Sequence, residues 1–303
     1  MKNPTRVAKN EYQKEFIKLF DGMCGRHSRY EVWQDFVLLT AIEISNAVDI
    51  VHREERNETY RSVVGKYTEK EREPFAAMLA QIVMGMEADP DQDFLGELYM
   101  NLNLGNSHAG QFFTPYDVCK MMAKTTCADI ADKIKAQGWV GVNDQTCGAG
   151  ATLVAFANLC REEGVNFQQY CLFTAQDIDY TVACMCYIQL SLMGCAGYVG
   201  VGNTITQPST SLDPRGLIPV DNGNVWYTPM YFSAPWHFRR VWTQMEMMFP
   251  NVVEMPAEDA PVDSVSPEPE IRPAILPEPE APQTAIQEAV TLNVTESGQL
   301  TLF

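Results

Sequence analysis

Short apolar segments alternate with helical segments in the middle of this 303-residue chain. The pattern predicts strands at residues 139–143, 170–175 and 198–201, with helices at 153–160 and 182–193 between them. Strands that alternate with helices of this length are typical of βαβ units, in which parallel strands form one sheet. We therefore expect an α/β fold built on a parallel sheet.

The flanking segments have other compositions. In residues 1–104 apolar side chains recur at helical spacing, which predicts a helical N-terminal domain. Residues 105–250 make up the predicted α/β domain, with a further strand at 225–232 and a helix at 236–249. Residues 251–298 are rich in Pro, Glu and Ala, and such a stretch buries too little apolar surface to fold. We expect an acidic, disordered linker there.

Composition excludes several classes of protein. No run approaches the roughly 18 apolar residues of a membrane span, and the polar N-terminus lacks the apolar stretch of a secretory signal, so we expect a cytoplasmic protein. The nine cysteines and four histidines show no zinc-ligand spacing and fit reduced, buried thiols. The net charge is −17, of which residues 251–303 carry −9. Because the rest is also acidic, binding of nucleic acid would require a local basic patch or a partner subunit.

The first predicted strand leads into a glycine-rich turn at residues 144–150 (DQTCGAG). Glycine is needed where a ligand approaches the backbone and leaves no room for a Cβ atom. The N-terminus of the next helix would offer free N–H groups to a carboxylate or a phosphate. Glycines in such a turn can equally serve helix–strand packing, so both interpretations stay open.

Asp177 lies just past the second predicted strand, 27 residues after Gly150. In nucleoside-binding α/β folds an acid at this position accepts hydrogen bonds from the ribose hydroxyls. The alternative is that Asp177 only caps the following helix. Asp179 comes two residues later, and the sequence assigns it no role.

Four ordered segments carry a family resemblance: residues 110–115 (GQFFTP), 144–150 (DQTCGAG), 176–179 (QDID) and 202–204 (GNT). Together they resemble the motifs of the N6-adenine DNA methyltransferases, especially the modification subunits of type I restriction–modification systems and their phage relatives. The resemblance covers about residues 92–205. It implies a Rossmann-like S-adenosylmethionine-dependent methyltransferase fold. We expect this fold to be shortened, because the predicted ordered chain ends near residue 250.

The resemblance implies a set of cofactor-binding residues that follow these motifs along the chain: Phe112, Thr114, Pro115, Asp144, Thr146, Gly148, Gly150, Asp177, Ile178 and Asn203. The first motif would line the methionine end of S-adenosylmethionine, and the glycine-rich turn would hold its amino-acid part. Asp177 would bind the ribose, while Asn203 and Ile178 would contact the adenine ring.

The catalytic motif of that family, Asn/Asp-Pro-Pro-Tyr/Phe after the fourth strand, does not occur in this sequence. In that motif the side chain and a backbone carbonyl accept hydrogen bonds from the target amine, and the aromatic ring stacks on the flipped base. The nearest candidate is residues 233–236 (SAPW), in which Ser233, Pro235 and Trp236 would be catalytic. Residues 227–230 (YTPM) are a rival candidate. The alternative is that Pro235 starts a helix and Trp236 packs in the core.

The chain ends in QLTLF at residues 299–303, which resembles the short peptide by which bacterial proteins bind the replicative sliding clamp. Gln299 would supply hydrogen bonds, Leu302 and Phe303 would fill an apolar pocket, and Leu300 belongs to the same contact set. A long disordered linker before these residues suits a tethered motif. The alternative is a C-terminal strand that joins the sheet.

Three functions follow from these observations. The first is an N6-adenine DNA methyltransferase with an altered catalytic motif, and the second is a non-catalytic subunit or regulator that binds S-adenosylmethionine. The third is a clamp-bound interaction protein that has lost its cofactor site. The missing tetrapeptide counts against the first, whereas Asp177, Gly148 and Gly150 count against the third. By resemblance we name the first, with DNA and a partner subunit as partners and with no metal.

Overall fold

The computed structural model describes residues 8–104, 113–127, 129–209, 212–213, 215–221 and 223–249, and two short strands near the C-terminus. Residues 1–250 form one compact unit and residues 251–303 a second. In the described part of the chain, no helix combines the length and apolar character needed to cross a membrane.

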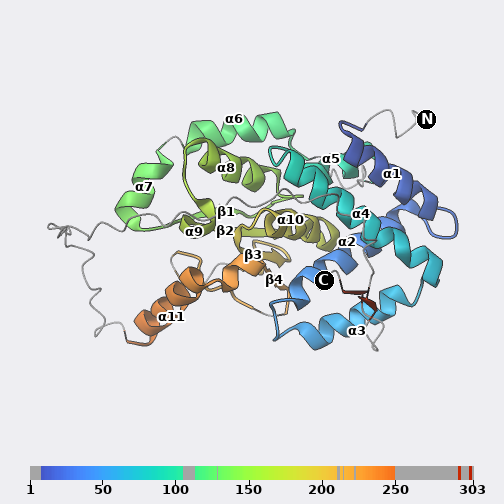
Figure 1. Cartoon of the computed structure of the whole chain (residues 1–303). Helices are drawn as coiled ribbons and strands as arrows, with labels where there is room; N and C mark the ends of the chain where they lie inside the picture. The colour runs from blue at the N-terminus through green and yellow to red at the C-terminus, as the bar shows by residue number, and fades with distance from the viewer. Residues whose placement is uncertain are drawn as a thin grey trace, which may run out of the picture. The chain divides into compact units, whose positions relative to one another are not determined.

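A four-stranded sheet lies at the centre of the first unit, in the order β1-β2-β3-β4 (Figure 1). The strands β1 (Val140–Asp144), β2 (Cys171–Asp177) and β3 (Ala196–Val201) run parallel, which confirms the predicted βαβ arrangement. The fourth strand, β4 (Val225–Tyr227), is antiparallel to β3. The carboxyl ends of the three parallel strands therefore meet at one edge of the sheet.

The predicted strand at 225–232 was wrong in its second half. The strand β4 contains only Val225–Tyr227, and Pro229–Phe232 form the short 3₁₀ helix η3. Pro229 has no N–H to donate to a strand ladder, and its fixed φ suits the first turn of a helix. The chain then continues into α11 (Ala234–Met248).

The helix α10 (Tyr180–Leu192) is buried along most of its length at the centre of the unit. It packs on β2 and β3 on one side, and on α2 (Arg29–Asn46) and α5 (Phe94–Asn101) on the other. Such an environment explains why its sequence is apolar on every face rather than on one stripe. It thereby joins the N-terminal helices to the sheet.

The remaining N-terminal helices are α1 (Glu11–Met23), α3 (Arg53–Val64) and α4 (Glu69–Ala88), and α1 packs along α4. A side chain caps α1, because the side-chain oxygen of Asn10 accepts the N–H of Gln13 across 2.8 Å. One continuous apolar core runs from these helices into the sheet. A boundary at residue 104 between separately folding domains therefore stays a prediction.

Helices cover the two faces of the sheet unequally. The helix α8 (Ala151–Glu162) lies with α10 on one face, and α6 (Tyr116–Thr126) packs outside α8. The short helices α7 (Ile130–Gln137) and α9 (Phe167–Tyr170) precede β1 and β2. On the opposite face a second core joins η3 and the first turn of α11 to Leu172 and Tyr198.

The second unit contains the short strands β5 (Asn293–Val294) and β6 (Leu300–Thr301), which pair antiparallel with each other. In the described part of this segment, Leu300–Thr301 do form a strand, but it belongs to this separate pair and not to the four-stranded sheet. Gln299, Leu302, Phe303 and nearly all of the predicted linker at 251–298 lie outside the described residues.

All nine cysteines are free thiols, and seven of them are buried, as the sequence predicts. The Sγ atoms of Cys160 and Cys171 lie 3.9 Å apart between α8 and β2. Burial raises the pKa of the Cys184 thiol, which keeps it protonated at neutral pH. These thiols are small apolar core groups.

Candidate cofactor-binding site

The glycine-rich turn after β1 is closed by its own hydrogen bonds. Asp144 accepts the N–H of Thr146 across 3.1 Å with one carboxylate oxygen and the hydroxyl of Thr152 with the other. The N–H of Gly150 donates to the carbonyl of Cys147 across 2.8 Å. Asp144 thus ties the end of β1 to the first turn of α8.

A Cβ atom at each of the two glycines of the turn would meet a different neighbour. Both have positive φ, 55° at Gly148 and 96° at Gly150. A Cβ atom on Gly150 would lie 2.8 Å from the Sγ of Cys186, so this glycine allows the turn to pack against α10. A Cβ on Gly148 would lie 3.3 Å from the ring of Phe113. The packing interpretation therefore accounts for Gly150, and only Gly148 faces the segment that carries the first motif.

Asp177 connects the ends of the three parallel strands. Its carboxylate accepts the N–H of Gly148 across 3.0 Å and that of Asp179 across 2.9 Å, and its carbonyl accepts the N–H of Gly202 across 2.9 Å. The carboxylate is half-buried beside two further acids. Burial raises the pKa of Asp177, the two backbone N–H groups oppose this, and the charges of Asp179 and Asp144 raise it further.

The structure also separates the roles of Asp177 and Asp179. Asp179 caps α10, because its carboxylate accepts the N–H groups of Thr181 and Val182 across 2.9 and 3.1 Å. The alternative in which Asp177 is only a helix cap was therefore wrong. Asp177 is left with accepting capacity on both oxygens, since each carboxylate oxygen carries two lone pairs.

The N-terminus of α8 opens at the same edge of the sheet. Its N-cap is Gly150, so no side chain caps the first turn. The first N–H groups of an α-helix have no partners within the helix, and the helix dipole favours an anion at this point. The turn thus places these N–H donors close to the carboxylate acceptor of Asp177.

The loop after β3 completes this edge. Asn203 is exposed, and its side-chain oxygen accepts the N–H groups of Ile205 and Thr206 across 2.9 and 3.2 Å. The hydroxyl of Thr204 donates to the carbonyl of Gln145 across 3.2 Å, which joins this loop to the glycine-rich turn. Ile178 is 71% exposed and leaves an apolar surface beside Asp177.

The first motif is described only in part. Gly110, Gln111 and Phe112 lie outside the described residues. Thr114 is exposed, and α6 begins at Tyr116 with Pro115 as its N-cap. The backbone N–H groups of Val118 and Cys119 donate to the carbonyl of Pro115 across 2.9 and 3.2 Å.

Three residues that sequence reasoning missed support this site. The ring of Phe113 stacks on Tyr99 at 5.4 Å and lies against Gly148. Gln189 of α10 donates to the carbonyl of Ala149 and to the carboxylate of Asp93, each across 2.8 Å. The signal for Gln189 was present, since it is the single amide in an otherwise apolar helix. No local pattern marks Asp93.

The candidate catalytic residues lie elsewhere. Trp236 is fully buried, and its Nε1 donates to the carbonyl of Gln168 across 2.7 Å, three residues before β2 begins. Asp177 ends β2, and seven strand residues span about 20 Å. Trp236 therefore lies near the amino edge of the sheet, opposite the candidate cofactor site. Ser233 is the N-cap of α11 and Pro235 lies in its first turn, in agreement with the alternative in which Pro235 starts a helix and Trp236 packs in the core.

The side chains of the rival motif at 227–230 also make hydrogen bonds within the fold. The hydroxyl of Thr228 donates to the carbonyl of Cys195 across 2.6 Å and accepts the N–H of Gly197 across 3.0 Å. Thr228 is fully buried, and Tyr227 donates to Asp221 across 2.7 Å. These side chains anchor β4 to β3.

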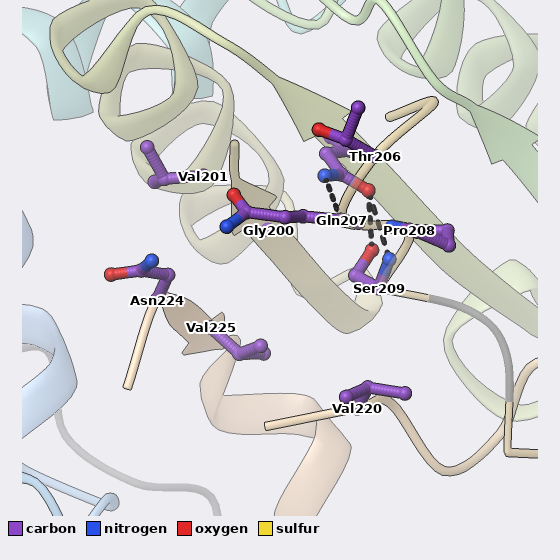
Figure 2. Close-up of a pocket in the computed structure, with 10 residues that line it drawn as sticks. Gly200, Val201, Thr206, Gln207, Pro208, Ser209, Val220, Asn224 and Val225 are labelled. Atoms are coloured by element: carbon purple, nitrogen blue, oxygen red, sulfur yellow. Dashed lines mark hydrogen bonds between the residues drawn. The ribbon is translucent and has the colours of Figure 1, made fainter. Parts of the chain in front are cut away.

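A cavity of about 280 Å³ lies near the carboxyl ends of β2 and β3, beside the loop that contains Gln207, Pro208 and Ser209. Figure 2 shows the residues that line it. Gln176 lines it, and neighbouring strand residues point to opposite faces, so this cavity lies on the other face from the Asp177 side chain. The amide of Gln176 is satisfied by Ser209, Gly202 and Gln207. It holds the loop closed over the sheet.

The comparison with known families agrees with this geometry. Residues 91–239 match the model of the N-6 DNA methylase family. This segment is an N-6 DNA methylase domain. It runs from the turn before α5 into the first turns of α11, and it contains Asp144, Asp177 and Asn203. The family resemblance and the predicted α/β fold are thereby confirmed.

Two solved structures are similar to this chain. One is the methyltransferase subunit of a type I restriction–modification system from Streptococcus thermophilus, with 18% identity and a TM-score of 0.37. The region in which the two structures match includes 69% of this chain and 47% of the Streptococcus protein. The other, from Listeria monocytogenes, is described as a class I S-adenosylmethionine-dependent methyltransferase, with 14% identity and a TM-score of 0.34. The matching region includes 70% of this chain and 55% of the Listeria protein.

This chain thus spans about half the length of these two proteins. No curated protein matches it. What the family comparison shows is an N-6 DNA methylase domain at residues 91–239 of this chain.

Proposed function

We propose that this chain binds S-adenosylmethionine at the carboxyl edge of β1–β3 and acts in the N6-methylation of adenine in DNA. The observation that carries the proposal is the position of Asp177. Its half-buried carboxylate is held 3.0 Å from the N–H of Gly148, beside a helix N-terminus without a side-chain cap. Ribose hydroxyls are donors that such a carboxylate accepts, and a carboxylate is the anion that such a helix end binds.

The chemistry of the donor set fits S-adenosylmethionine. This cofactor supplies a methyl group bound to a positively charged sulfonium. The charges of Asp179 and Asp144 lie close enough to Asp177 to raise its pKa, in addition to the larger effect of burial, so the three acids together create a negative potential that attracts a cation. The N–H groups at the start of α8 suit the amino-acid carboxylate, and exposed Ile178 offers an apolar surface to the adenine ring.

The other residues of the first and second motifs enter the proposal through the resemblance. Phe112, Thr114 and Pro115 are proposed to line the methionine end, and Thr146 to lie with Asp144 along the amino-acid part. Asn203 is proposed to bond the adenine ring. Its loop is joined to the glycine-rich turn by the bond from Thr204 to Gln145, which supports a shared site.

A second candidate function is a cofactor-binding component that does not itself hold the target base. The position of Trp236 favours it, because a fully buried ring near the opposite edge of the sheet cannot stack on a flipped adenine. In this candidate, a partner subunit supplies the groups that accept the adenine amine. Such a partner would also provide the basic surface that DNA binding requires.

Cofactor binding is tested by titrating S-adenosylmethionine into the full chain in a calorimeter. Asp177→Asn is expected to weaken binding by about 10- to 100-fold, because a charge-assisted hydrogen bond contributes roughly 1.5–3 kcal/mol. Asp179→Asn is the matched control, because it removes one negative charge two positions away while asparagine keeps the helix cap, so the excess loss in Asp177→Asn measures the direct bond rather than the shared potential. Equal affinities for Asp177→Asn and the wild type would contradict the assigned ribose role.

Methyl transfer is tested with labelled S-adenosylmethionine and unmethylated bacterial DNA. Label on the N6 atom of adenine with the chain alone supports the enzyme. Label on DNA only after a cellular extract supplies a partner supports the cofactor-binding component. A chain that retains no label and passes none to DNA would contradict both candidates.

We also propose, from the C-terminal sequence, that residues 299–303 bind the bacterial sliding clamp and bring a cytoplasmic protein to replicating DNA. The support is the sequence QLTLF. Retention of the full chain on immobilised clamp, and its loss on deletion of these five residues, is the expected result. Retention that the deletion leaves unchanged would contradict this assignment.

A further inference from the structure

Helix α11 has two faces of different character. On its inner face Trp236 is fully buried, and Arg239 donates to the carbonyl of Gln169 across 2.6 Å. Arg240 donates to the carbonyl of Tyr231. These contacts are all in the first two turns, so the helix is held at its N-terminal end and extends away from the strands (Figure 1).

The outer face of α11 is a stripe of large apolar side chains. Phe238, Val241, Met245 and Met248, which we call the α11 seam, are 66%, 39%, 43% and 71% exposed. Their spacing of three, four and three residues is the a/d repeat of helices that pair along one seam. Single exposed apolar residues are normal on a protein surface, but a contiguous row is typical of an interaction site.

The side chains beside the seam are also suited to close packing. Trp242 stacks on Phe238 at 6.2 Å, and its Nε1 donates to Glu246 across 2.7 Å. The polar atom of this tryptophan is thus already satisfied, and its ring widens the apolar surface. No seam position carries a charge, and the basic Arg239 and Arg240 face inward. A partner would therefore meet a surface without buried charges to compensate.

The size of the surface suits a helix of the same kind. α11 has 15 residues, and at 1.5 Å per residue it is about 22 Å long. Large apolar side chains exposed to this degree present on the order of 500 Å². Two copies would then bury roughly 1,000 Å² in total, which is the lower limit for a specific protein interface.

Two partners for the α11 seam are always present: the acidic residues 251–303 of the same chain, and a second copy of the chain. Their charges distinguish them. Residues 251–303 carry ten acidic residues and one basic residue, and they would need basic partners on α11. The two arginines of the first turns are bound to backbone carbonyls of the same unit, so charge complementarity with the tail is missing. A second copy presents an identical uncharged seam, and twofold symmetry makes one such surface complementary to itself.

We propose that the α11 seam is a dimer interface, in which it packs antiparallel against the α11 seam of a second copy of this chain. The antiparallel arrangement brings Phe238 of one copy towards Met248 of the other. It also places the two anchored N-terminal turns at opposite ends of the helix pair. Because the interface is at the lower limit of size for a specific complex, we expect a weak dimer, with a dissociation constant on the order of 1–100 µM.

The test is sedimentation velocity of the full chain from 1 to 200 µM. The wild type is expected to shift from monomer to dimer over this range. Met245→Glu places a charge in the seam, and Met247→Glu is the matched control, because Met247 is 48% exposed on the same helix but lies off the a/d repeat. Met245→Glu is expected to weaken dimerisation at least tenfold and Met247→Glu to leave it nearly unchanged.

Phe238→Glu provides an independent second variant at the other end of the seam, and it is expected to weaken dimerisation as Met245→Glu does. Circular dichroism melts check that each variant is folded, and all three side chains are exposed enough that folding is expected to survive. A wild type that stays monomeric up to 200 µM would overturn the proposal. A dimer that Met245→Glu and Met247→Glu weaken equally would overturn it too.

Discussion

The side-chain amide of Gln189 donates to the carboxylate of Asp93 across 2.8 Å, between two residues that are 96 positions apart in the chain. The same nitrogen donates to the carbonyl of Ala149 across 2.8 Å, and the amide oxygen accepts the N–H of Leu95 across 3.1 Å. This buried bridge connects the start of α5, the middle of α10 and the glycine-rich turn. The shape of the turn therefore depends on a helix that precedes the sheet.

Asp93 makes this bridge dependent on pH. Burial raises the pKa of Asp93 to about 6, although bonds from Gln189 and Gly96 oppose the rise. Between pH 6 and 4 the folded chain binds a proton that the unfolded chain does not yet bind, so the free energy of unfolding increases as the pH falls through this window. That contribution is lost again as the pH rises through 6.

Asp93→Asn is expected to remove this dependence and to stabilise the chain at pH 7.5 by at most about 3 kcal/mol, because a shift of one pKa unit corresponds to 1.36 kcal/mol. Asparagine still caps α5 and still accepts a hydrogen bond. Urea unfolding of the wild type and the variant at four pH values between 4.5 and 7.5 checks this. A pH dependence that persists in the variant would assign it to another group.

The two glycines of the turn are expected to differ in their tolerance of alanine. Gly150→Ala is expected to cost about 2–4 kcal/mol, since it combines a left-handed backbone with a Cβ 2.8 Å from the Sγ of Cys186. Gly148→Ala meets the Phe113 ring at 3.3 Å and is expected to cost about 1–2 kcal/mol.

A double-mutant cycle separates the two causes at Gly150. In Gly150→Ala combined with Cys186→Ala, the contact with sulfur is relieved while the positive φ remains. The double variant is therefore expected to be more stable than the sum of the single changes predicts. Simple additivity in urea unfolding would show that the φ value alone requires glycine.

The sequence was sufficient for the parallel strands because their signals are local. An apolar run, a glycine-rich turn and an acid at the strand end each occupy a few consecutive residues. The antiparallel direction of β4 has no such signal, since it depends on Thr228 binding the backbone of Cys195 and Gly197. Tertiary partners of this kind also placed Trp236 in the core.

The different roles of Asp177 and Asp179 also could not be predicted from the sequence, although the two residues are only two positions apart. Both are acids near a strand end and a helix start, so either could cap the helix. Only the geometry shows that Asp179 binds the N–H groups of α10, whereas Asp177 turns towards Gly148. The strand ends and the family resemblance therefore indicated the candidate site, and the roles of these two acids required the folded chain.

The raised pKa of Asp177 predicts how cofactor binding depends on pH. Burial raises this pKa above the usual 3.8, so Asp177 takes up a proton at a higher pH than an exposed aspartate would. Protonation removes the charge that is proposed to hold the ribose, and the affinity for S-adenosylmethionine is expected to fall as the pH drops through that pKa.

Calorimetric titration at pH values from 4.5 to 8 checks this expectation, with Asp177→Asn as the reference. The variant cannot titrate at this position, so its affinity is expected to stay weak and to change less between pH 4.5 and 6. Parallel pH profiles of the two proteins would show that another group controls binding.

Arg56 fastens the N-terminal helices to the edge of the sheet. It is 7% exposed, and its guanidinium donates to Asp49 across 2.6 Å and to the carbonyl of Val225 across 2.8 Å. It also lies over the ring of Trp226 at 4.2 Å. Arg56→Met is expected to cost about 3 kcal/mol of unfolding free energy, because it leaves buried Asp49 without the arginine and with His52 as its remaining side-chain partner.

The combination of Arg56→Met with Asp49→Asn is the control for this prediction. With both charges removed, the loss is expected to be smaller than in Arg56→Met alone. Urea unfolding at pH 7.5 distinguishes the cases. A double variant as unstable as the sum of the two single variants would mean that the residues stabilise the fold independently.

Trp236 offers a direct test of whether residues 233–236 form a catalytic motif. The indole is fully buried, contacts Trp139 edge-on at 5.5 Å and lies under Arg239 at 4.4 Å. Trp236→Ala is expected to destabilise the chain by about 3–5 kcal/mol, as truncation of a buried aromatic does. Trp236→Phe keeps most of the packing and loses the bond to Gln168, so a smaller loss is expected.

Both variants, at a temperature where they remain folded, are expected to bind S-adenosylmethionine with wild-type affinity and to transfer methyl groups at an unchanged rate per folded molecule. Selective loss of methyl transfer in Trp236→Phe, with folding and cofactor affinity intact, would instead place this ring in the reaction. Because Gln168 and Asp177 lie at opposite ends of β2, such a loss would require the α11 segment to move before the target base binds.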